Sequence, residues 1–229
     1  LLYLQIGAEC SKCYSYYTYQ CDSLMASPNG DKQWDSFLTE AIGKGLKGRQ
    51  LRNAIPHRRM SATIYKNYPQ GKITVTDFLL GQYYLYEDAL NSQEWNIESD
   101  SMKVVLGHEC QKATCSFRGR KWTAWFALDV PVSDGPLKFC GLPGLIMEVY
   151  DKGKQYYFCI NGMQQVSATS ITFGNLNKDF KHFQKTNRKD FLLSKYRYLR
   201  NQNSINEAST GISLGSVDEA LKYDLIERE

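Results

Sequence analysis

Cysteines are the residues of this 229-residue chain whose chemistry is most informative. Three lie near the N-terminus and four in the middle of the chain: Cys10, Cys13, Cys21, Cys110, Cys115, Cys140 and Cys159. They lack the paired spacing of a zinc site, and such a number is typical of a protein from an oxidising compartment. We therefore predict structural disulfides that involve Cys110, Cys115, Cys140 and Cys159. Cys110 and Cys115 cannot bridge within one uninterrupted strand, because five residues at about 3.3 Å each exceed the Cα separation of about 6 Å that a disulfide permits.

Two other interpretations of the thiols are open to test. Cys10-Ser-Lys-Cys13 has redox spacing, but it leads into a predicted strand and lacks the helix N-terminus that lowers a thiol pKa, which disfavours an oxidoreductase. His108, Cys110 and Cys115 form the alternative, a copper(I) or zinc set for a metal-handling protein. A metalloprotease is excluded, because Lys112 stands where the second His of a zincin motif is needed.

No other motif predicts catalysis. The sequence contains no nucleophile elbow, P-loop or dinucleotide fingerprint. Asp129 and Asp134 flank Pro131 in a turn-rich stretch, where Asp side chains usually cap backbone N–H groups rather than move protons. We expect no catalytic residue and no cofactor, and we predict that the protein is not an enzyme.

Aromatic side chains supply the binding candidates. Trp122 and Trp125 are separated by an odd number of residues, so they point to opposite faces of one predicted strand. If Trp122 faces the core, Trp125 either lies beneath a helix or forms a binding patch with Phe117 or Tyr150.

Charge and hydropathy exclude several partners. No acidic residue lies between Glu40 and Asp77, whereas eight Lys and Arg residues do, so the 41–76 segment is either a solvated face or a surface for phosphate, lipid headgroups or an acidic partner. Aromatic residues do not alternate with these bases, which argues against nucleic acid. No apolar run approaches the roughly 18 residues of a transmembrane helix.

The elements that position these residues are mainly strands, because aromatic residues make up 13% of the chain. Two strands are predicted in residues 1–21, a meander over 60–106, hairpins over 109–130 (turning at Gly119) and 145–160, and a strand over 166–173. Helices are predicted from Asp31, with Trp34, Phe37, Leu38 and Ile42 facing the core, after Asn177 with Phe180 and Phe183, and after Asn187 with Phe191, Leu192, Tyr196 and Leu199. We expect one domain over 1–202 and a polar, loosely attached tail over 203–229.

Residues 141–146 read Gly-Leu-Pro-Gly-Leu-Ile, between the two predicted hairpins. Pro143 presets φ for a turn, and Gly144 is predicted to adopt positive φ there. The hexapeptide is preceded by further pieces in order: Leu4 to Gly7, IYKNYPQGKIT at 64–74, Tyr84 to Glu87, Trp95 to Ile97, GHECQKA at 107–113 and FRGRKWTAWF at 117–126. Over roughly residues 4–160 the chain resembles the GLPGLI family.

This resemblance implies a secreted or envelope protein of a Bacteroidota-type Gram-negative bacterium, made with a signal peptide. The chain begins at Leu1 without an initiator Met, and we expect its true N-terminus to lie upstream. The resemblance implies no catalytic residue, and it suggests a TonB-dependent outer-membrane transporter as partner. By analogy we expect a mainly β (α+β) fold with a curved antiparallel sheet or half-barrel, similar to lipoprotein carriers and covered by a few helices. Cys10, Cys13 and Cys21 depart from the family pattern.

Overall fold

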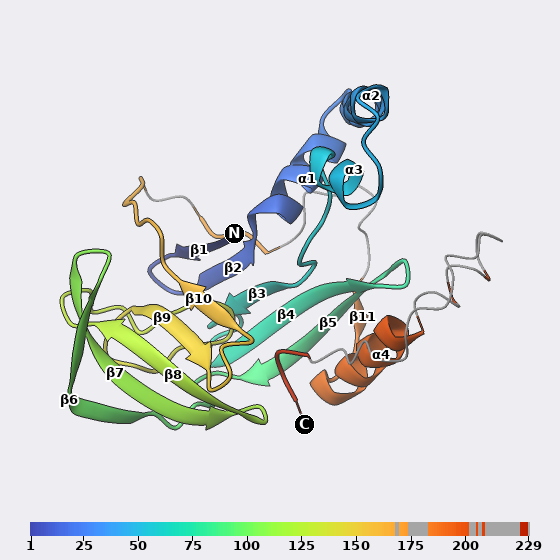
Figure 1. The fold of residues 1–229 in the computed structure, drawn as a ribbon. Coiled ribbons are helices and arrows are strands. Elements are labelled where there is room, and N and C mark those ends of the chain that lie inside the picture. The colour runs from blue at the N-terminus through green and yellow to red at the C-terminus, as the bar shows by residue number, and fades with distance from the viewer. Residues whose placement is uncertain (168–169, 174–182, 202–204, 206–207, 209–224, 229) are drawn as a thin grey trace.

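The computed structural model describes residues 1–167, 170–173, 183–201, 205, 208 and 225–228. Their strands form two sheets, accompanied by four described helices, which confirms the predicted mainly β class. Neighbouring strands pair antiparallel, except that β11 runs parallel to β5. Figure 1 shows the two sheets side by side, with the helices around the first.

Sheet A contains six strands in the order β1-β2-β3-β4-β5-β11. Their bounds are β1 Leu2–Ile6, β2 Ser11–Ser15, β3 Thr63–Lys66, β4 Lys72–Leu79, β5 Gln82–Ala89 and β11 Gln184–Lys185. Sheet B contains five strands in the order β10-β9-β8-β7-β6. Their bounds are β6 Asn96–Val105, β7 His108–Phe117, β8 Arg120–Ala127, β9 Ile146–Asp151 and β10 Tyr157–Cys159.

Three of the hairpins turn on the same pair of backbone conformations. Leu80-Gly81, Leu106-Gly107 and Arg118-Gly119 each place two successive residues at positive φ, between 50° and 84°. Such two-residue turns match the right-handed twist of the flanking strands, and glycine supplies one of the two positions without steric cost. The predicted hairpin at Gly119 is therefore confirmed.

The N-terminal third differs from the prediction. The second strand ends at Ser15, and the tyrosine-rich residues that follow form α1 (Tyr16–Ala26) instead of continuing a strand. The reason is a cap, because the Ser15 hydroxyl accepts a hydrogen bond from the Thr18 N–H at 3.3 Å. Two more helices follow, α2 (Gly30–Gly43) and α3 (Gly48–Ala54).

Helices α1 to α3 project beyond one end of sheet A (Figure 1). The predicted apolar stripe of α2 therefore does not reach the core: Phe37 and Ile42 are 42% and 57% exposed. Trp34 is half-buried and donates its indole N–H to the carbonyl of Pro56, at 3.3 Å. Residues of this stripe pack within the helical projection, because α2 contacts α1 and α3.

Helix α4 (Arg188–Arg200) is confirmed with its predicted cap, since the Asn187 side chain accepts a hydrogen bond from the Asp190 N–H. It packs beside β5, where Phe191 is buried against Tyr84 and Tyr86. The strand predicted over 166–173 is not formed by the described residues of that stretch. Of the turn predicted after Asn177, the residues up to 182 lie outside the described part of the chain. None of the described helices is long and apolar enough to span a membrane.

A small buried cluster, which includes Cys110 and Ala127, packs against Trp125 of sheet B and Leu4 of sheet A. The two larger clusters lie between the sheets. One contains Trp122 and Phe126 of sheet B together with Phe139, and the other contains Ile73, Val75 and Tyr86 of sheet A. Phe158 and Ile226 pack against both clusters and so join them.

Candidate functional site

The segment between β8 and β9, residues 128–145, contains the GLPGLI hexapeptide and folds back against its own ends. The Leu145 N–H donates to the carbonyl of Val130 and the Ala127 N–H to that of Leu145, at 3.0 and 2.9 Å. Gly144 lies so close to this backbone that a Cβ there would be 1.8 Å from the Ala127 oxygen. The predicted positive φ belongs instead to Gly141, at 91°, so Gly144 is required by close approach and not by its dihedral angle.

A buried ion pair anchors this segment to sheet A. Lys66, the last residue of β3, extends its ammonium to the carboxylate of Asp134 and to the carbonyls of Gly135 and Phe139, the last at 3.2 Å. Both side chains are almost fully buried. The Asp134 carboxylate also accepts the Gly135 N–H at 2.6 Å. All three N–H groups of the ammonium thus have acceptors, which is the condition for retaining a charge in a protein interior.

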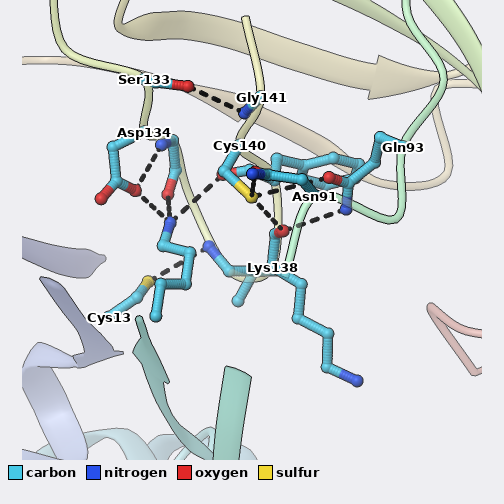
Figure 2. Close-up of polar contacts among 12 residues, drawn as sticks. Cys13, Asn91, Gln93, Ser133, Asp134, Lys138, Cys140 and Gly141 are labelled. Atoms are coloured by element: carbon cyan, nitrogen blue, oxygen red, sulfur yellow. Dashed lines mark hydrogen bonds and ion pairs between the residues drawn. The ribbon is translucent and has the colours of Figure 1, made fainter. Parts of the chain in front are cut away.

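Figure 2 shows the polar contacts around Cys140, on the other side of the same segment. Its thiol lies 3.5 Å from the Asn91 side-chain oxygen and 3.6 Å from that of Gln93. Gln93 donates to the carbonyl of Lys138 at 3.0 Å, and Trp95 donates to that of Cys140 at 2.8 Å. These bonds fix the backbone before the hexapeptide.

Two thiols, Cys13 and Cys140, lie close enough to Lys66 for its positive charge to act on them. Burial nevertheless raises the pKa of both thiols, and the charge of Lys66 only partly opposes that effect. The Cys13 sulfur also accepts the Leu137 N–H at 3.3 Å. Because a protonated thiol is a poor nucleophile, the arrangement favours packing over catalysis. No motif in the sequence could reveal Lys66, and the redox spacing of Cys10 and Cys13 did not predict that Cys13 packs against this segment.

All seven cysteines, which the structure describes, carry unbonded sulfurs. Cys110 and Cys115 lie on opposite faces of β7, one packing with Val105 and Met147 and the other with Trp122. The pairings predicted for Cys110, Cys115, Cys140 and Cys159 stay predictions; a direct bridge between the first two is excluded by these positions, as expected.

The alternative metal set is not assembled. Because Cys110 and Cys115 point to opposite faces of β7, these two thiols and His108 cannot all bind one metal ion. The imidazole of His108 instead contacts the Asp129 carboxylate, at 2.8 Å. Within the described part of the chain, no group of three or more His, Cys, Asp or Glu residues is placed to hold a metal.

The face of sheet B opposite to Trp122, which we call the outer face, carries two of the aromatic candidates. Trp125 packs there against a buried cluster that Leu4 of sheet A also contacts. Trp125 pairs in register with Glu148, and Thr123 pairs with Tyr150, so Trp125 and Tyr150 share this outer face. Tyr157 of β10 stacks on Tyr150 with ring centroids 5.9 Å apart and is 51% exposed. Phe117 does not lie with them. It shares the opposite face with Trp122, as the register of the β7–β8 hairpin requires, and is buried against Phe139.

Three charged side chains lie beside these rings. The Lys103 ammonium lies 4.6 Å from the centroid of the Trp125 ring and forms an ion pair with Glu148 at 2.6 Å. Lys154 lies over the Tyr150 ring at 5.2 Å. Within the part of the chain that the structure describes, the Trp125 indole N–H is buried without a hydrogen-bond partner. The outer face thus combines aromatic rings with two lysines and the largely buried carboxylate of Glu148.

Comparison with known proteins finds one segment of the chain that is similar to a described family. A family model whose description is "Protein of unknown function (Porph_ging)" matches residues 118–148, from the β7–β8 turn through the hexapeptide. No curated protein matches the chain.

Two solved structures of PNGF-II, in space groups C2 and P21, are similar to this chain at 12% and 11% identity, with TM-scores of 0.47 and 0.46. Each alignment covers 84% of this chain and 29% of the PNGF-II chain. The chain thus spans less than a third of the length of these proteins.

Proposed function

We propose that this chain is a non-enzymatic cell-envelope protein that binds a ligand or a TonB-dependent outer-membrane transporter through the outer face of sheet B. The observation that carries the proposal is the grouping of Trp125, Tyr150 and Tyr157 on one surface, next to the charges of Lys103 and Glu148. Aromatic rings with a polar rim are typical of recognition surfaces, because they bury area at a low cost in side-chain entropy.

Binding is favoured over catalysis by the state of the reactive groups. The Lys66 and Asp134 charges are paired with each other and with backbone groups. In the reduced chain, burial raises the pKa of Cys13, Cys110, Cys115 and Cys140, which keeps these thiols protonated at neutral pH. These groups therefore act as structural supports in our proposal.

The proposed envelope location can be tested by fractionation of the source cells, with export to the periplasm or the outer membrane as the expected result. Mass spectrometry of the exported protein without reductant is expected to show at least two intramolecular disulfides. Recovery in the cytosolic fraction with seven free thiols would contradict the proposal.

The binding surface is tested by co-sedimentation of the purified protein with outer-membrane vesicles from the source cells. The variant Tyr150→Ala/Tyr157→Ala is expected to lose at least about tenfold in bound fraction, because both stacked rings are removed. Val104→Ser is the matched control, since Val104 is 68% exposed on β6 and lies outside the aromatic group. Equal binding of the aromatic variant and the wild type would exclude this face as the binding surface.

A further inference from the structure

The end of the described chain, residues 225–228, lies between the two sheets (Figure 1). Ile226 packs against the core clusters of both sheets. These residues belong to the stretch that the sequence predicted to be a loosely attached polar tail, yet their contacts are those of a bound peptide. Ile226 is the apolar anchor.

Glu227 is the charged anchor, and it meets cations from three separate parts of the fold. Its carboxylate lies 2.5 Å from the ammonium of Lys138, 3.6 Å from the guanidinium of Arg188 and 4.0 Å from that of Arg118. Lys138 precedes the hexapeptide, Arg188 begins α4, and Arg118 forms the β7–β8 turn. Convergence of three cations on one carboxylate makes this position selective for an acidic side chain.

The backbone of the segment is recognised as well. Arg120 donates to the carbonyls of Leu225 and Ile226, at 2.8 and 3.0 Å. The Arg228 N–H in turn donates to the carbonyl of Arg118, at 2.9 Å. Hydrogen bonds to the main chain do not depend on the identity of the side chains, so they are available to any peptide that has suitable anchors and adopts the bend of residues 226 and 227.

The described side chains around residues 225–228 include more positive than negative charges, which favours an anionic ligand. Asp88 pairs with Arg118 and Lys138, and Asp151 pairs with Arg120. Among the described residues, four cations, counting Arg188, therefore lie around two carboxylates, and Glu227 supplies a third carboxylate. An acidic peptide complements this site, whereas a basic or neutral one leaves buried cations less well paired.

We propose that Arg118, Arg120, Lys138 and Arg188 form a peptide-binding site for a bent segment in which an aliphatic residue precedes Glu or Asp. Residues 225–228 occupy this site in cis, and an acidic segment of another protein is the partner that replaces them. The site is separate from the outer face of sheet B, so it does not depend on the function proposed above.

The test uses the full-length chain and a fluorescein-labelled peptide with the sequence of residues 224–229. In the wild type, the tethered segment competes at an effective concentration of about 1 mM, so a peptide with a Kd of about 10 μM would bind roughly 100-fold more weakly than to an empty site. The variant Ile226→Ser/Glu227→Gln weakens both anchors of the tethered segment. It is expected to bind the labelled peptide at least about tenfold more tightly than the wild type, in fluorescence polarisation.

Three controls define the site. Lys138→Gln added to this variant is expected to abolish peptide binding. Lys121→Gln, at an exposed position of the β7–β8 hairpin, is expected to leave peptide binding unchanged. A labelled peptide with Gln in place of Glu227 is expected to bind at least about tenfold more weakly. If the double variant does not fold, Glu227→Gln alone, which keeps the shape of the side chain, is expected to give a gain of about tenfold, because a tethered segment that binds tenfold more weakly competes tenfold less.

A folded variant that binds the peptide no better than the wild type would overturn the proposal, and residues 225–228 would then be a permanent internal clasp. Equal binding of the Glu and Gln peptides would overturn the assignment of an acidic ligand.

Discussion

At the scale of single residues, the two glycines of the hexapeptide show what a sequence can and cannot reveal. A Pro-Gly pair before an apolar run predicts a turn, and the chain does turn there. Which glycine takes positive φ could not be predicted, since Gly144 is set by the approach of the Ala127 carbonyl, 17 residues earlier in the chain. The pairing of Lys66 with Asp134 could not be predicted either, because only the packing of the 128–145 segment against sheet A brings the two residues together.

The first prediction concerns the close approach at Gly144. Gly144→Ala is expected to lower the free energy of unfolding by about 1–3 kcal/mol, because the new Cβ would collide with the Ala127 carbonyl at the end of β8. Gly43→Ala is the control: a Cβ at that helical position meets nothing within 4 Å, and alanine favours a helix. Urea denaturation measures both, and equal midpoints for the two variants would refute the prediction.

The second prediction concerns the Lys66–Asp134 pair. Lys66→Met leaves the Asp134 carboxylate buried without its cation and is expected to cost about 3–5 kcal/mol of unfolding free energy. Adding Asp134→Asn removes the stranded charge and is expected to restore part of that loss. A double-mutant cycle from urea denaturation measures the coupling. Additive effects of the two substitutions would show that the pair does not interact.

At the scale of elements, caps and turns determine where helices and strands begin. The Asn187 cap and the apolar positions after it predicted α4 correctly, as the Gly119 turn did for the β7–β8 hairpin. Alternation within that hairpin correctly separated Trp122 from Trp125. Helix α1 was missed because tyrosines favour strands, while the Ser15 cap that starts this helix is a weak and common signal.

Those caps provide the third prediction. Asn187→Ala is expected to destabilise the protein by about 1 kcal/mol, because the Asp190 N–H loses its acceptor at the start of α4. Asn29 precedes α2 in the same way but makes no capping hydrogen bond through its side chain. Asn29→Ala is therefore expected to change the melting temperature much less, and a larger effect at Asn29 than at Asn187 would contradict this interpretation of the two caps.

At the scale of the whole molecule, the sheets are joined by chain segments that are distant in sequence. The 128–145 segment reaches from sheet B to Lys66 of sheet A, and Ile226 packs between both sheets. Alternation of residues predicts which side of a strand is apolar, but it carries no information on how strands divide between two sheets. The mainly β class could therefore be predicted from the sequence, whereas the contacts between the two sheets could not.

Burial of thiols throughout this interior makes the stability of the reduced protein sensitive to alkaline pH. Burial raises the pKa of Cys115 from 9.0 to about 12, and it also raises the pKa of Cys13, Cys21, Cys110 and Cys140. Between about pH 9 and pH 12 the unfolded chain releases the Cys115 proton while the folded chain retains it. Unfolding is thus increasingly favoured as the pH rises through this range.

The fourth prediction compares wild type and Cys115→Ala in urea, with reductant present, at pH 8 and pH 10.5. Alanine lowers stability at both pH values because it leaves a small cavity, but it removes the thiol whose ionisation favours the unfolded state. The decrease in midpoint from pH 8 to pH 10.5 is therefore expected to be smaller in the variant than in the wild type. An equal decrease would show that the folded protein gives up the Cys115 proton as readily as the unfolded chain, and that the thiol is not shielded between the sheets.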